Sequence, residues 1–102
     1  MPFRICLQDE TGETIESVTD VHGILDGLMP FDERDTFPTI GYIDPYGDTT
    51  FNRIQMEPFL AEWRSLHARC ADSAVAEMLK KVEHLATQCL NEPHWYLKFE
   101  GD

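Results

Sequence analysis

The stretch that decides the fold is MEPFLAEWRSLHARCADSAVAEMLKKVEHLATQCL, residues 56–90. Apolar side chains recur three and four positions apart on both sides of a short break at residues 71–73, which is the spacing of two amphipathic helices. Pro58 marks the start of the first helix, because proline is best tolerated at the first helical position. Asp72 or Ser73 is suited to cap the second helix by accepting from its first amides. Since the link is so short, the two helices are expected to lie antiparallel as a hairpin.

Alternation of apolar and polar residues predicts strands on both sides of the helical hairpin. A turn around Gly12 joins the first two strands, which predicts a β-hairpin. The dense turn signal DPYGD at residues 44–48 predicts a second hairpin. The aromatic run near the end of the chain predicts a last strand. Residues 19–38 keep no sustained period and are expected to form a short helix or turn followed by an exposed acidic loop. The strands are expected at residues 3–7, 14–18, 39–43, 49–51 and 94–99.

This order of elements predicts one α+β domain over residues 1–102, with an antiparallel sheet of about five strands and the helical hairpin packed on one face as a second layer. A chain of 102 residues can bury one core without disulfides or metal. Cys6, Cys70 and Cys89 form an odd set without a C-x-x-C pair, which indicates reduced thiols. Cys70 and Cys89 are expected to be small buried apolar side chains.

The chain carries 19 Asp and Glu against 8 Lys and Arg, a formal net charge of −11. Residues 1–48 hold 11 acidic and 2 basic side chains, a balance of −9, so the N-terminal half carries most of the charge. Nucleic acid and anionic membranes are disfavoured as partners, because binding phosphates needs positive side chains. No run approaches the roughly 18 to 20 apolar residues of a membrane span. A cytoplasmic protein is therefore expected.

Few residues carry a signature of chemistry. Asp44 and Asp48 flank the tight turn and are interpreted as turn caps or partner contacts, since the ligand order of a calcium loop is absent. His67, Cys70 and His84 invite a nucleophile or zinc interpretation, but no orienting group or complete ligand set is readable. Phosphate-binding glycine motifs are absent. We expect no enzyme, no metal and no cofactor.

The segments YIDPYGDTTFNRIQM at residues 42–56 and HWYLKFEGD at residues 94–102 resemble a group of small acidic bacterial proteins of uncharacterised function. The resemblance covers about a quarter of the chain. It implies a bacterial source and a single domain, and it supplies no activity, cofactor or catalytic residue.

The uneven charge is interpreted as a docking face for a basic protein, because summed charge steers encounter. The most concrete expectation is an immunity-type protein that covers the cationic surface of a bacterial toxin such as a nuclease, without chemistry. One alternative is a small structural or regulatory subunit, a homodimer joined through an edge of the sheet. An enzyme using His67, Cys70 or His84 is another, and a merely solubilising surface is the plainest. The predicted contact residues are Asp32, Glu33, Asp35, Asp44, Tyr46 and Asp48.

Overall fold

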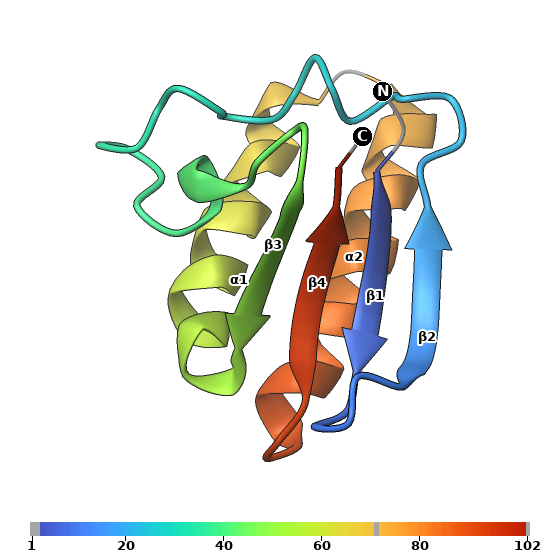
Figure 1. Ribbon diagram of the computed structural model, residues 1–102. Coiled ribbons are helices and arrows are strands. Elements are labelled where there is room, and N and C mark those ends of the chain that lie inside the picture. Colours follow the sequence, from blue (N-terminus) through green and yellow to red (C-terminus); the bar gives the residue numbers. More distant parts are fainter. Residues whose placement is uncertain (1–2, 71, 102) are drawn as a thin grey trace.

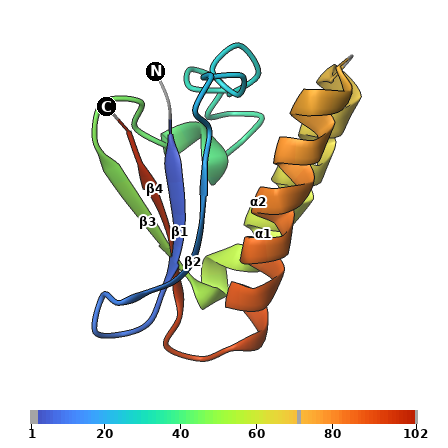
Figure 2. The same cartoon turned by 90° about the vertical axis from the view of Figure 1, so that its right-hand side faces the viewer.

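The computed structural model describes residues 3–70 and 72–101, so Ala71 of the predicted break and the closing Asp102 lie outside the described residues. A sheet and two helices form two layers (Figures 1 and 2). In chain order the elements are β1 (Arg4–Gln8), β2 (Thr14–Thr19), η1 (Ile40–Tyr42), β3 (Asp48–Asn52), η2 (Arg53–Gln55), α1 (Met56–Ser65), η3 (Leu66–Arg69), α2 (Ser73–Asn91) and β4 (Tyr96–Glu100), where η marks a 3-10 helix.

The strands form one antiparallel sheet in the order β2-β1-β4-β3. The predicted N-terminal hairpin is confirmed, and Gly12 in its turn has a φ of 88°, which a side chain would strain. Asp9 holds this turn by accepting from the amides of Thr11 and Glu13 at 2.9 and 3.1 Å. The last strand β4 lies between β1 and β3, so the C-terminal segment closes the centre of the sheet.

Residues 39–43 do not form the predicted strand, so the second hairpin is wrong. Glu62 on α1 accepts from the backbone N–H of Thr39 and of Ile40, each at 2.9 Å, and these amides are therefore unavailable to a ladder. Ile40 and Ile43, three positions apart, are both buried, which is the spacing of a 3-10 turn. As a result β3 pairs only with β4, and the sheet of the described residues has four strands rather than about five.

Both predicted helices are present, although α1 begins at Met56 and not at Pro58 as predicted. They run antiparallel over one face of the sheet, and no described element covers the opposite face (Figure 2). Asn52 and Gln55 form a capping box around η2, which leads directly into α1, with bonds of 2.9 and 3.1 Å. Asp72 caps α2 by accepting from the amide of Ala74 at 2.7 Å. Within the described ranges, neither helix is long and apolar enough to cross a bilayer.

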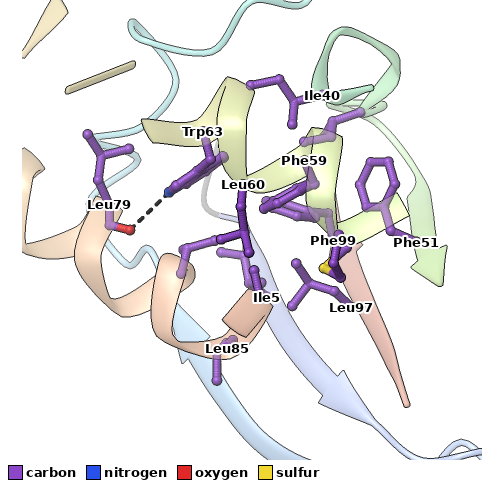
Figure 3. Packing of buried hydrophobic residues seen from close by; sticks show 14 of the residues in the cluster. Ile5, Ile40, Phe51, Phe59, Leu60, Trp63, Leu79, Leu85, Leu97 and Phe99 are labelled. Carbon is purple, nitrogen blue, oxygen red and sulfur yellow. Dashed lines mark hydrogen bonds between the residues drawn. The ribbon is translucent and has the colours of Figure 1, made fainter. Parts of the chain in front are cut away.

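The core between the layers is built around aromatic side chains (Figure 3). Phe99 of β4 contacts the rings of Phe59 and Trp63 on α1, with centroids 6.0 and 5.9 Å apart. Trp63 is fully buried and its indole N–H donates to the backbone oxygen of Leu79 on α2 at 2.9 Å. One side chain thus joins α1, α2 and the sheet, and the buried indole donor is satisfied.

The long connection from β2 to η1 forms a series of turns without a regular helix, and it is fixed at both ends. Asp20 is buried and accepts from the amides of Ile24 and Leu25 at 3.0 and 2.9 Å. Phe37 at the other end is also buried. The acidic loop is therefore held against the body of the domain. Asp20 itself is buried, so it does not contribute to the exposed charge of this loop.

Candidate protein-binding site

The acidic loop after β2 and the turn after η1 meet at one end of the sheet, the upper end in Figure 1. Together they enclose a surface hollow of about 520 Å³. Its side chains combine two carboxylates with exposed aromatic rings and one guanidinium. We call this feature the acidic hollow; the residues that define it are Asp32, Arg34, Tyr42, Asp44, Pro45 and Tyr46.

The turn that forms one wall is rigid because its own side chains cap it. Asp44 accepts from the amide of Tyr46 at 2.8 Å, and the amide of Asp44 donates to the hydroxyl of Thr49 at 2.9 Å. The predicted turn-capping role of Asp44 is confirmed. The turn also lies against the end of β4, where a Cβ on Gly101 would stand 2.7 Å from the backbone of Pro45. Only glycine allows this approach, so the C-terminal end of the chain helps to place the site.

The loop that forms the other wall is held by an ion pair beside the hollow. Both terminal nitrogens of Arg69 donate to the carboxylate of Glu33, at 2.7 and 2.8 Å. These bonds lower the pKa of Glu33 below its ordinary value. The Arg69 guanidinium also lies 4.9 Å from the centre of the Phe37 ring. Glu33 therefore positions the loop and has its charge already matched by Arg69.

Two tyrosines give the hollow its exposed rings. Tyr42 is 61% exposed and Tyr46 is 75% exposed, which is unusual for side chains of this size. The guanidinium of Arg34 lies 5.1 Å from the centre of the Tyr42 ring. The ring of Tyr46 has no such contact within the described residues. It remains available to a cation from outside the molecule.

The structure brings three of the six predicted contact residues together: Asp32, Asp44 and Tyr46 line the acidic hollow. Glu33 is turned to Arg69, and Asp35 is exposed on the loop outside the hollow. Asp48 begins β3 and pairs with Lys98 at 3.5 Å. Tyr42, Arg34 and Pro45 are part of the site but were not predicted.

The sequence gives no reliable sign of Tyr42, because residues 39–43 read as a strand in which a tyrosine is as often buried as exposed. Within the described residues neither Asp32 nor Asp44 makes an ion pair, and the Arg34 guanidinium lies over the Tyr42 ring. Two such carboxylates beside an open tyrosine ring are suited to an arginine or lysine side chain. The carboxylates supply charge-assisted hydrogen bonds and the ring supplies a face for the cation.

The thiol and the imidazoles considered for chemistry lie beside polar groups of the described residues. The Cys70 thiol donates to the backbone oxygen of Asp72 at 3.0 Å. His67 lies 3.7 Å from Glu83 and His84 lies 3.9 Å from Glu16, both beyond hydrogen-bond distance, and the buried Nε2 of His67 has no hydrogen-bond partner within the described residues. The described residues contain no group of three or more metal-ligating side chains. Cys70 is half-buried rather than buried as predicted, whereas Cys89 is buried and burial raises its pKa to about 11.

No family model, curated protein or solved structure matches this chain.

Proposed function

We propose that this chain is a binding domain for a basic protein and that the partner docks a cationic side chain in the acidic hollow. The most concrete form is an immunity-type protein of the bacterial cytoplasm that covers the cationic surface of a toxin. The observation that supports it is the meeting of Asp32 and Asp44 with the open ring of Tyr46 in one hollow. Occlusion of a surface needs no chemistry, so the domain acts without catalytic residues.

The electrostatics of the whole molecule favour this partner. A net charge of −11 attracts a basic protein from a distance and raises its association rate, whereas the hollow fixes the orientation at contact. Exposed tyrosine is one of the residue types that most often dominate a binding interface. The charge therefore governs encounter, and Tyr46 with the two carboxylates governs how long the complex lasts.

The test compares two variants of equal charge. Asp32→Lys with Asp44→Lys reverses the hollow, and Glu13→Lys with Glu92→Lys reverses two exposed carboxylates at the opposite end of the sheet; each pair changes the net charge from −11 to −7. The probe is the protein encoded immediately upstream of this chain. We expect the hollow variant to raise Kd about thirtyfold and to lose protection of cells that express the probe, and the distal variant to change Kd little.

Tyr46→Ala keeps the net charge and removes an exposed ring, so a weakened turn cannot explain its effect. We expect it to raise Kd about tenfold, mainly through faster dissociation. If both reversals weaken binding equally and Tyr46→Ala has no effect, the hollow is not the docking site. No binding by the wild-type protein would overturn the immunity assignment for this probe.

A further inference from the structure

A second hollow of the described surface lies along the free side of β2. It has a volume of about 600 Å³ and is enclosed by β2 on one side and α2 on the other. Figure 2 shows the molecule with the β2 edge toward the viewer and α2 beside it. We call it the edge groove; the residues used to define it are Ser17, Val18, Thr19, Lys80, Lys81 and His84.

The backbone of β2 offers a row of hydrogen-bonding groups to this groove. The backbone N–H of Asp20 donates to the backbone oxygen of Phe3 at 2.8 Å. With the register of the two strands, this bond shows which residues of β2 direct their backbone groups toward β1. Because bonding alternates along an antiparallel pair, the N–H and C=O groups of Ser17 and Thr19 point away from β1. In the part of the chain that the structure describes, β2 has no second neighbour. Such an edge can accept another strand.

The groove is lined by two lysines and one carboxylate, that of Glu16, so its charge is opposite to that of the molecule. Lys80 and Lys81 lie side by side on α2, and among the described residues neither makes an ion pair, whereas Arg4, Arg64, Arg69 and Lys98 each have a carboxylate partner. His84 adds an imidazole, 3.9 Å from Glu16. Arg34 and Arg53 also make no ion pair within the described ranges, but neither lines this groove. Lys80 and Lys81 are two adjacent unmatched cations that border a free strand edge.

A second copy of this chain is a poor occupant of the groove. A symmetric dimer through β2 joins the same patch of both copies, so Lys80 and Lys81 of one copy approach the same lysines of the other. Repulsion between these lysines therefore acts at the contact itself. The charge pattern instead fits a different chain with carboxylates.

We propose that an extended, acidic segment of another protein adds to β2 as a further strand. Its backbone pairs with the outward groups of Ser17 and Thr19, and the alternate side chains that face α2 are carboxylates, which meet Lys80 and Lys81. Strand addition of this kind takes affinity from main-chain hydrogen bonds and specificity from every second side chain. The protein thus has two docking surfaces of opposite charge, one for a basic partner and one for an acidic strand.

The probe is a blocked hexapeptide that alternates threonine and glutamate, titrated at millimolar concentrations into the full chain and followed by amide NMR. We expect shifts at β2 and at residues 80–84, and slower exchange of the Ser17 and Thr19 amides. Lys80→Gln with Lys81→Gln should weaken binding about fivefold. Arg53→Gln with Lys98→Gln makes the same charge change outside both hollows and should leave the peptide affinity unchanged.

A backbone variant tests strand addition directly. Ser17→Pro removes one outward N–H without breaking a bond to β1, since proline is tolerated on an edge strand. It should weaken the peptide at least threefold. Thr50→Pro on β3 is the matched control at the other edge of the sheet. The backbone N–H of Gly101 donates to the oxygen of Gly47 at 2.7 Å, and because bonding alternates along β3, the backbone groups of Thr50 also point away from β4.

Three results would overturn the proposal. The first is an absence of binding by a wild-type protein whose melting curve shows it to be folded. A second is a set of amide NMR shifts that fall outside β2 and α2, or an equal loss of peptide affinity in Ser17→Pro and Thr50→Pro. The third is a dimer in sedimentation that Ser17→Pro dissociates, because the occupant is then a second copy.

Discussion

At the scale of single residues, Asp20 is a buried carboxylate whose hydrogen bonds are made by the backbone. It is the one polar or charged side chain among the described residues that is fully buried, at 1% exposure. Its two oxygens accept from Ile24 and Leu25, so the carboxylate closes the turn that leads from β2 into the acidic loop. The sequence places it among the exposed carboxylates, because nothing in the neighbouring residues shows which amides will face it.

Removal of this carboxylate should destabilise the domain more than removal of an exposed one. Asp20→Ala leaves two amides without an acceptor and is expected to lower the free energy of unfolding by about 2 kcal/mol. Asp20→Asn keeps one acceptor oxygen and should recover about half of that loss. Urea denaturation measures both, with Asp35→Ala, an exposed position in the same loop, as the control. Equal midpoints for Asp20→Ala and Asp35→Ala would contradict this role.

At the scale of elements, the sequence predicts those parts that depend on local pattern. The apolar stripe of α2, its cap at Asp72 and the turn at Gly12 are all local, and each is confirmed. The failure at residues 39–43 has a long-range cause, since the carboxylate that draws this segment into η1 is Glu62 on α1, more than twenty positions away in sequence. The site has long-range causes of the same kind, since Arg69 after α1 draws Glu33 away from the acidic hollow and Lys98 on β4 pairs with Asp48.

Glu62 is therefore expected to fix both η1 and the wall of the acidic hollow. Glu62→Ala frees the amides of Thr39 and Ile40, and we expect a loss of about 2 kcal/mol in stability and faster hydrogen exchange at these two amides. Glu62→Gln keeps an acceptor oxygen and should preserve most of the protection. Glu57→Ala, an exposed change on the same helix, is the control. Unchanged exchange at Thr39 and Ile40 in Glu62→Ala would show that η1 forms without this anchor.

At the scale of the whole molecule, the acidity that favours a basic partner acts against the folded state. Eleven excess negative charges on a domain with a radius of gyration of 12.5 Å repel one another, and this repulsion falls when the chain unfolds and expands. Ion pairs such as Glu33 with Arg69 offset it only locally. The net charge therefore lowers the stability of the free protein.

This repulsion between like charges predicts that salt stabilises the free protein. Raising sodium chloride shortens the screening length from roughly 30 Å at 0.01 M to about 3 Å at 1 M, which removes most of the self-repulsion. We expect Tm to rise by about 4 °C, equivalent to about 1 kcal/mol for a domain of this size. The Glu13→Lys, Glu92→Lys variant has a net charge of −7, so its Tm should be higher at low salt and respond less. If salt instead lowers Tm in both proteins, local ion pairs outweigh the repulsion between like charges. The net charge then does not lower the stability of the free protein.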